Sequence, residues 1–235
     1  MTGKLAFVAT AGSISAIVLL ALGIGLSGRD WADARHLWGA RQFSCGSATA
    51  TSQQVTLPFT ATDNLTIDLP ASVRYQPGDK AEAVVSGDPA LIDHVRMEGG
   101  KLSLDCDPGW LDSRLDVNLS GPAISNWKLL GSGDLTLSQI NQPQLRLSIR
   151  GSGSVAATGA ADTVGLNISG SGAARLKDLA AKSVQIDIRG SGDAQLSAQA
   201  DADISISGSG NVELFGRPIL RRSEIRGSGR IVQVP

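Results

Sequence analysis

The sequence predicts an all-β fold in which short coils stack into a β-solenoid. The triplet Gly-Ser-Gly occurs six times, beginning at residues 131, 151, 170, 190, 208 and 227, so that copies lie 18 to 20 residues apart. Apolar and polar residues alternate on both sides of each triplet, with the period of two that β-strands have. A fixed period near 20 residues, built from strands and glycine turns without a helical pattern, is typical of coils that stack only on their neighbours.

The glycines of the triplets are predicted to mark the corners of the coils. In the alternating pattern both glycines fall on the face that carries the apolar residues, so both are expected to point inward, where a missing Cβ lets the chain bend. A flexible Gly/Ser linker is the alternative, but it would not keep isoleucine two positions before five of the six triplets. The glycines are Gly131, Gly133, Gly151, Gly153, Gly170, Gly172, Gly190, Gly192, Gly208, Gly210, Gly227 and Gly229.

Stacking turns each repeat position into a column of side chains. The predicted inward column before the triplets is Leu129, Ile149, Ile168, Ile188, Ile206 and Ile225. The outward column next to it is Leu130, Arg150, Ser169, Arg189, Ser207 and Arg226. Arginine on alternate coils keeps like charges about 10 Å apart, which favours solubility, because coils stack about 4.8 Å apart. A possible ligand face formed by Arg150, Arg189 and Arg226 is the alternative.

Two carboxylates add a second hypothesis for the same face. Asp187 and Glu224 share another outward column and are two coils apart. Paired acids at roughly 5 to 10 Å can cleave glycosidic bonds. Simple surface decoration explains the pair equally well, and no aromatic platform accompanies it, so a non-enzyme is favoured.

Residues 1–28 are predicted to form an N-terminal membrane anchor or signal segment. Residues 5–26 carry neither charge nor proline over 22 positions, which is enough for a transmembrane helix. A cleavable signal has a shorter apolar region, so an uncleaved anchor is preferred, with cleavage as the alternative. Residues 29–54 follow as a tether, and the β domain is expected at residues 55–235.

Residues 55–122 are expected to form less regular first coils that cover the end of the solenoid. Gly/Pro turns separate their alternating segments, and residues 90–97 are predicted to be a short helical turn or a loop. The predicted strands lie at residues 65–69, 81–86, 101–106 and 115–119.

The two cysteines, Cys45 and Cys106, allow a disulfide. In an exported protein it would close a loop of about 60 residues, worth about 4 kcal/mol on the chain-entropy model. A buried thiol and an exposed thiol are the alternative.

Composition argues against several function classes. The net charge is −1 and 18% of residues are charged, so nucleic acid is not expected as a partner. The chain contains only two histidines, His36 in the tether and His94, which stands alone in the sequence. Neither a histidine-centred catalytic site nor a metal or cofactor site is therefore predicted.

The order of these segments carries a family resemblance. An alternating strand at residues 65–69, then Val73-Arg74-Tyr75-Gln76-Pro77-Gly78, Val84-Val85-Ser86-Gly87-Asp88 and Gly100-Lys101-Leu102-Ser103-Leu104, precede the Gly-Ser-Gly coils. Over about residues 55–235 this layout resembles the bacterial envelope family of autotransporter adhesins with a head GIN domain. The resemblance implies a right-handed parallel β-solenoid in the cell envelope and no known catalytic residues.

These observations together predict a non-catalytic envelope module. We expect tethering in the inner membrane through residues 5–26 with the β domain in the periplasm, or secretion to the periplasm after cleavage. An envelope polymer or a protein is the expected ligand, or the domain is a spacer. A polysaccharide-active enzyme and a ligand-sensing envelope protein are the alternatives. Arg226, Arg230 and Pro235 would protect the strand edge of the last coil, so a monomer or weak oligomer is predicted.

Overall fold

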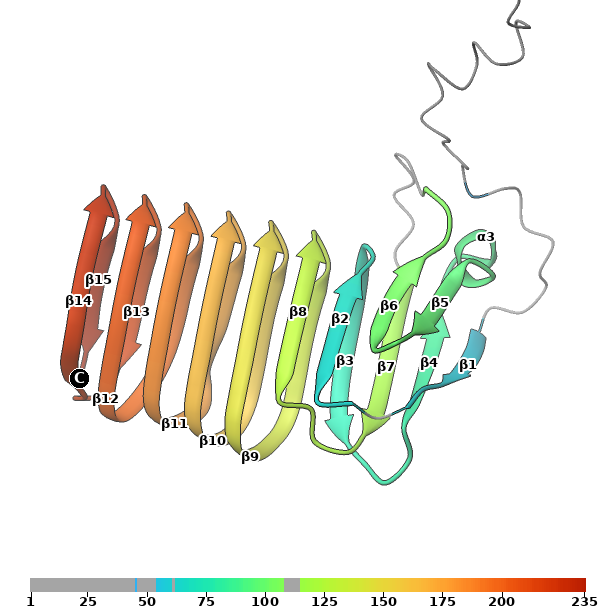
Figure 1. Cartoon of the computed structure of the whole chain (residues 1–235), viewed down its shortest axis with the longest axis horizontal. Coiled ribbons are helices and arrows are strands. Elements are labelled where there is room, and N and C mark those ends of the chain that lie inside the picture. The colour runs from blue at the N-terminus through green and yellow to red at the C-terminus, as the bar shows by residue number, and fades with distance from the viewer. Residues whose placement is uncertain (1–44, 46–53, 61, 108–114) are drawn as a thin grey trace, which may run out of the picture. The chain divides into compact units, whose positions relative to one another are not determined.

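Cys45 and residues 54–60, 62–107 and 115–235 are described by a computed structural model. This part of the chain is all-β apart from one helical turn, and its coils stack into a β-solenoid of about five turns (Figure 1). The predicted all-β solenoid of stacked coils is confirmed. The predicted anchor at residues 5–26 lies outside the described residues. Within the described ranges, no helix combines the length and the apolar character needed to cross a bilayer.

Long strands that bend midway build the regular coils. The first part of β9 pairs with β3, whereas its last part pairs with β8, so one strand contributes to both walls of a flattened coil. The regular coils consist of β8 (Asn126–Gly131), β9 (Asp134–Gly151), β10 (Ser154–Gly170), β11 (Ala173–Gly190), β12 (Asp193–Gly208), β13 (Asn211–Phe215), β14 (Ile219–Gly227) and β15 (Arg230–Val234).

We name the two walls by their position relative to the triplets. The pre-triplet wall comprises residues 126–131, 144–151, 163–170, 183–190, 201–208 and 219–227, and it faces the viewer in Figure 1. The post-triplet wall comprises residues 134–137, 154–157, 173–176, 193–197, 211–215 and 230–234. All pairs between successive regular coils are parallel, so equivalent repeat positions stack on one another.

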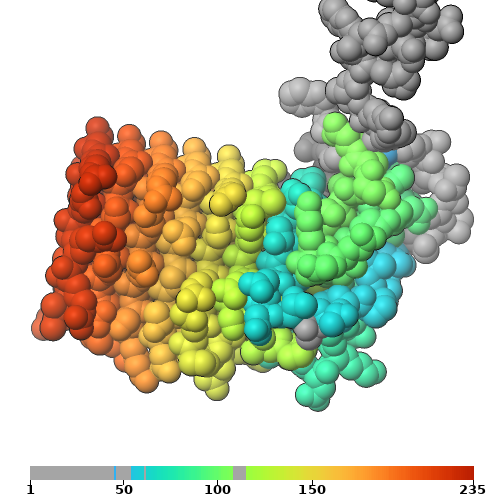
Figure 2. Space-filling model, viewed as in Figure 1, coloured from blue at the N-terminus to red at the C-terminus, as the bar shows by residue number. Residues whose placement is uncertain are grey.

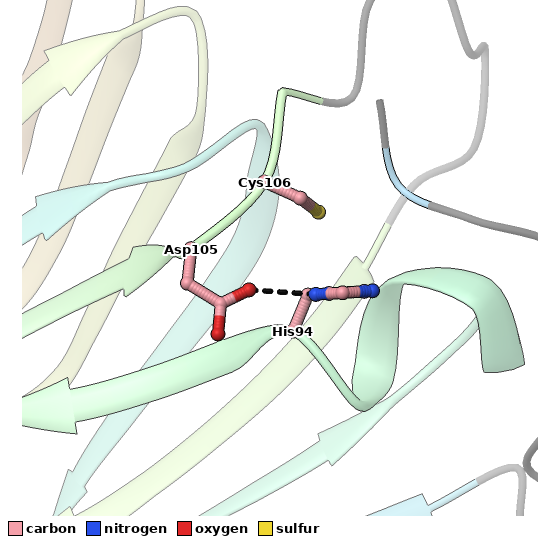
Figure 3. Close-up of side chains that lie close together, drawn as sticks. All are labelled: His94, Asp105 and Cys106. Carbon is pink, nitrogen blue, oxygen red and sulfur yellow. Dashed lines mark hydrogen bonds and ion pairs between the residues drawn. The ribbon is translucent and has the colours of Figure 1, made fainter. Parts of the chain in front are cut away.

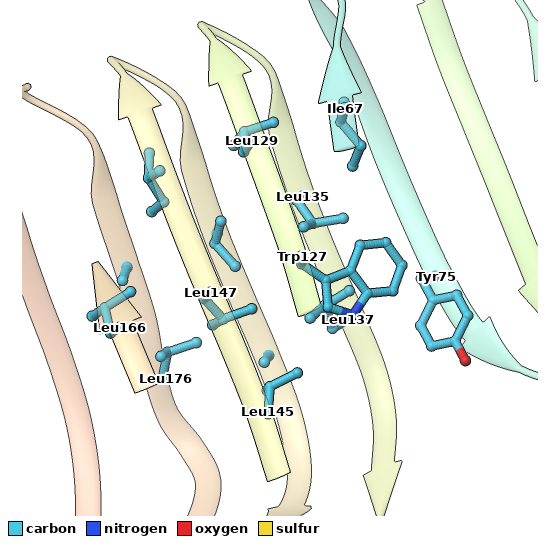
Figure 4. Packing of buried hydrophobic residues seen from close by; sticks show 14 of the residues in the cluster. Ile67, Tyr75, Trp127, Leu129, Leu135, Leu137, Leu145, Leu147, Leu166 and Leu176 are labelled. Carbon is cyan, nitrogen blue, oxygen red and sulfur yellow. The ribbon is translucent and has the colours of Figure 1, made fainter. Parts of the chain in front are cut away.

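Aliphatic side chains fill the space between the walls. The predicted inward column of Leu129 and five isoleucines is in register along the pre-triplet wall. All its members are buried except Ile225, which is 41% exposed on the last coil. Leucines of the two walls, such as Leu129 and Leu135, lie across the interior from one another (Figure 4). Burial of these side chains makes the main favourable contribution to the stability of the stacked coils.

The two glycines of a triplet have different roles. The first glycines have positive φ angles of 82° to 135° and are not buried, so the prediction that they point inward is wrong. A Cβ on Gly190 would clash with the carbonyl oxygen of Gly170 in the preceding coil. The second glycine does point inward, because a Cβ on Gly192 would lie 2.6 Å from the Ile168 side chain. The alternation breaks at the triplet because the chain must reverse between the walls within three residues.

The triplet turns also hydrogen-bond to one another. The amide of Ser191 donates to the Gly170 carbonyl at 2.9 Å, and the amide of Asp193 donates to the Gly172 carbonyl at 3.2 Å. Equivalent bonds recur in neighbouring coils. The corner of the solenoid is therefore a backbone ladder, with the exposed middle serines outside it.

The first coils do not stack in sequence order. β2 (Asn64–Asp68) pairs with β6 (Lys101–Leu104) and with β8, while β3 (Ala71–Pro77) pairs with β7 (Leu115–Gly121) and with β9. The β2–β3 coil therefore lies between the β6–β7 coil and the first regular coil, although β6 and β7 follow it in the chain. The connection from β7 to β8 must pass the β2–β3 coil.

Antiparallel strands end the parallel stack. β4 (Glu82–Ser86) pairs with β7 and with β1 (Gln54–Pro58), and β5 (Val95–Glu98) pairs with β6. The turn between β5 and β6 uses Gly99 and Gly100, both with positive φ. Residues 90–97 contain the end of the helical turn α3 (Pro89–Ile92) and then the start of β5. The side chain of Asp88 caps α3 by accepting a hydrogen bond from the Ala90 amide. We call β1, β4, β5, β6, β7 and α3 the cap.

An aromatic pair joins the β2–β3 coil to the first regular coil. The ring centroids of Tyr75 and Trp127 are 4.8 Å apart (Figure 4). The Tyr75 hydroxyl donates to the Pro122 carbonyl at 2.8 Å, and the Trp127 indole donates to the Ile124 carbonyl at 3.0 Å. These bonds satisfy carbonyl groups of the β7–β8 connection, which the strand ladders do not reach.

Candidate binding surface

The residues predicted to form a ligand face all lie on the outer side of the pre-triplet wall. Arg150, Arg189 and Arg226 occupy one column, separated by Ser169 and Ser207. Asp187 and Glu224 occupy the neighbouring column, separated by Ser205. The structure therefore brings these five side chains onto one flat surface rather than into a cleft.

Four of the five form local ion pairs. Arg189 contacts Asp187 at 3.1 Å, and Arg226 contacts Glu224 at 2.6 Å. In both cases the partners are two residues apart on one strand, where side chains point to the same side. Among the described residues, no hydrogen bond links the two carboxylates, and each contacts its own arginine. This arrangement gives no support to a paired-acid site.

Further arginines of the last coil are also matched by acids. Arg222 contacts Asp203 at 2.7 Å, and Arg221 contacts Asp201 at 3.4 Å, both across to the preceding coil. The hydrogen bond and charge of Asp203 raise the pKa of the Arg222 guanidinium above its usual value. The C-terminal end of the pre-triplet wall is consequently balanced in charge.

Arg150 differs from the other two arginines of its column. The residue two positions before it is Ser148, so Arg150 lacks the neighbouring carboxylate that Arg189 and Arg226 have. Lys128 and Arg146 lie on the same face, and none of these three side chains makes a hydrogen bond or an ion pair with another described residue. We call Lys128, Arg146 and Arg150 the basic patch.

A shallow depression of about 460 Å³ adjoins the basic patch. Its lining includes the polar residues Asn64, Thr66, Asn126, Lys128, Arg146 and Asn167. The prediction of the ligand face missed Lys128 and Arg146. Reading the outward columns of the first two coils for cations without a nearby acid would have found them.

A second polar cluster lies at the end of the cap (Figure 3). His94 Nδ1 is 2.6 Å from one carboxylate oxygen of Asp105, and Arg96 is 2.6 Å from the other. Cys106 lies beside them and forms a disulfide with Cys45. His94, Asp105 and Cys106 are close enough to suggest a metal site, but the sulfur is in the disulfide and both carboxylate oxygens are engaged. The described cluster therefore does not present three free ligand atoms.

His94 was expected to stand alone, and that prediction is wrong. The antiparallel pairing of β5 with β6 places Val95 opposite Leu104, and the Asp105 amide donates to the His94 carbonyl at 3.0 Å. The hairpin thus brings together two residues that are 11 positions apart. No local pattern in the sequence indicates this contact.

A family model described as "Putative auto-transporter adhesin, head GIN domain" matches residues 62–218, about two thirds of the chain. The chain belongs to this family. The match covers the cap apart from β1, the β2–β3 coil and most of the regular coils, and so confirms the resemblance found in the sequence. Comparison with curated protein sequences gave no match.

Solved structures share the fold of this head GIN protein. A "putative adhesin" from Bacteroides fragilis NCTC 9343 superposes with a TM-score of 0.59 at 17% identity, covering 80% of this chain and 100% of that one. A "putative adhesin" from Parabacteroides merdae ATCC 43184 gives a TM-score of 0.50 at 16% identity, with 77% and 95% of the two chains covered. One from Parabacteroides distasonis ATCC 8503 gives 0.50 at 18% identity, with 77% and 96% covered. At these identities the similarity shows the fold alone.

Proposed function

We propose that this head GIN protein is a non-catalytic, membrane-tethered binding module of the bacterial cell envelope. The observation that carries the proposal is the outer side of the pre-triplet wall, where polar and charged side chains stand in register over successive coils. Such a surface offers repeated hydrogen-bonding positions to an extended ligand, whereas catalysis needs convergent groups around one bond. The adhesin description of the family agrees with binding.

The proposed location is the periplasmic side of the inner membrane. Residues 5–26 would be an uncleaved anchor, with a secreted periplasmic form as the alternative. The Cys45–Cys106 disulfide supports an oxidising compartment, because disulfides persist outside the cytosol. A right-handed coil sense is expected, since parallel crossovers between strands are almost always right-handed.

Binding and location are both testable with the full chain. In cell fractionation we expect the protein in the membrane pellet, accessible to protease only once the outer barrier has been opened. The chain purified in mild detergent should retain one class of envelope glycan or protein in array and pull-down experiments, without releasing sugar products. A soluble cytoplasmic protein, or failure to retain any envelope component, would contradict the proposal.

A further inference from the structure

We infer that the pre-triplet wall binds an anionic polysaccharide through the basic patch of Lys128, Arg146 and Arg150. The inference rests on the proposed function and names the chemical class of its ligand. The wall faces the viewer in Figure 2, where the stacked coils form one continuous surface. The patch lies on β8 and β9, next to the β2–β3 coil.

The spacing of the three cations follows from the strand register. Lys128 lies opposite Ser148, while Arg146 and Arg150 are the residues two positions before and after that serine. Lys128 is therefore a diagonal neighbour of both arginines, and diagonal neighbours on a sheet face lie roughly 7 Å apart. The two arginines are four residues apart along β9, or about 13 Å. Together they form a compact triangle of positive charge.

The lack of counter-charges sets this triangle apart from the rest of the wall. Toward the C-terminal end of the same wall, Arg189, Arg221, Arg222 and Arg226 each have a carboxylate partner. The patch has three cations and no acid bonded to any of them among the described residues, in a chain of net charge −1. Neighbouring like charges repel, so an anionic ligand would relieve an unfavourable interaction there.

The surroundings of the patch favour a sugar polymer. Amide and hydroxyl groups of Asn64, Thr66, Asn126 and Asn167 line the depression and can exchange hydrogen bonds with sugar hydroxyls. Gly165 lies opposite Arg146 and carries no side chain, which keeps the surface beside that guanidinium open. The depression is therefore accessible along the wall rather than enclosed.

A protein partner fits the patch less well. Protein interfaces depend on a few large apolar or aromatic anchors at their centre. The exposed large hydrophobic side chains of the described residues are all on the last coil, away from the patch: Ile219, Leu220, Ile225 and Val232. The patch thus offers charge and hydrogen bonds but no apolar anchor.

The test compares dextran sulfate with unmodified dextran, using the full chain in mild detergent. One variant combines Lys128→Gln, Arg146→Gln and Arg150→Gln. The matched control combines Arg189→Gln, Arg222→Gln and Arg226→Gln, which removes the same charge from the same wall. We expect the chain to bind dextran sulfate but not dextran, with at least a tenfold weaker affinity in the patch variant and less than a threefold change in the control. All six positions are on the outer surface, so melting temperatures should stay close to that of the parent chain.

A footprint on the unaltered chain tests the same assignment without mutation. Dextran sulfate should protect Lys128 from acylation. Lys177, an exposed residue of β11 outside the patch, should stay reactive. Equal loss of binding in the two variants, or no protection of Lys128, would overturn the assignment of the basic patch as the binding site. Binding to vesicles of anionic lipid without binding to dextran sulfate would overturn the polysaccharide assignment. Retention of a neutral glycan or a protein in place of dextran sulfate would overturn this inference and leave the proposed function standing.

Discussion

The regular coils and the cap solve the same packing problem by different means. In the regular coils every strand bonds to the equivalent residues of the next coil, and one 20-residue unit supplies both the apolar interior and the backbone ladder. The cap uses antiparallel strands, a disulfide and side-chain bonds to backbone carbonyls, such as the bond from the Ser86 hydroxyl to the Asp116 carbonyl. Repetition stabilises the coils through register, whereas the cap depends on a few specific long-range contacts.

This difference between the regular coils and the cap predicts how far the effect of a destabilising substitution extends in each region. A defect in one regular coil removes support from both of its neighbours, since each coil packs only on the next. A defect in the cap should loosen one end and leave the central coils paired. Substitutions in the two regions therefore separate the two kinds of stabilisation.

The largest effect is expected from Ile188→Asp in the middle of the regular coils. Ile188 is fully buried in the inward column, and an unpaired carboxylate there costs several kcal/mol. Arg189→Ser, its exposed neighbour, should change the free energy of unfolding by less than about 0.5 kcal/mol. Chemical and thermal denaturation of the two variants check this difference. Equal melting temperatures would contradict the assignment of Ile188 to the inner side of β11 and of Arg189 to its outer side.

The next largest effect is expected from removing the disulfide, and this effect should be confined to the cap. The bond spans 61 residues, and its loss in Cys45→Ala/Cys106→Ala costs about 4 kcal/mol on the chain-entropy model. Hydrogen exchange should show lost protection in β5 and β6 with β10 to β12 still protected. Equal loss in both regions would mean that the cap and the coils unfold as one unit.

Gly190→Ala tests the corner ladder of the regular coils. Its φ of 121° is unfavourable for alanine, and the new Cβ would meet the Gly170 carbonyl. A cost of roughly 3 kcal/mol is expected from strain of this kind. Ser191→Ala, at the exposed middle position, is the control and should be nearly neutral. If the two variants were equally stable, the first glycine would not be required for the turn.

Tyr75 gives a smaller, pH-dependent effect at the junction of the two regions. Burial raises the pKa of the Tyr75 phenol above 10, so the unfolded chain loses this proton first as the pH rises. The stabilising contribution is complete below pH 10 and declines above it. Tyr75→Phe should cost about 1–2 kcal/mol at neutral pH, because it removes the hydroxyl proton that the Gly121 and Pro122 carbonyls share, and it should reduce the alkaline loss of stability. Tyr75 is the only tyrosine, so absorbance reports its titration directly. An ordinary titration near pH 10 would contradict its burial.

The smallest effect is expected from the surface acids of the regular coils. Asp187→Ala and Glu224→Ala each remove one exposed ion pair, worth less than about 1 kcal/mol. Stability and binding should remain close to those of the parent chain. Loss of a sugar-hydrolysing activity in these variants, with the fold preserved, would favour the enzyme alternative instead.

Local patterns were sufficient for the regular coils but not for the cap. The triplet spacing predicted which residues share a column, and the isoleucine and arginine columns are in the predicted register. The same pattern misplaced the first glycine of each triplet, because alternation says nothing about φ. In the cap, β4, β6 and β7 were recognisable by their residues, whereas β5 was predicted to be a helical turn or a loop. The partners of the cap strands were not predicted, since pairing there joins segments that are distant in the chain.

The sequence by itself determined the stacked-coil fold, because a constant period forces equivalent residues into columns whatever lies at the ends. Only the tertiary structure decided the order of the first coils, the contact between His94 and Asp105, and the division of the arginines into paired and unpaired. The physical reason is the same in each case. These features depend on contacts between segments whose separation in the chain follows no repeat, and on which charged side chains find a counter-ion across neighbouring strands.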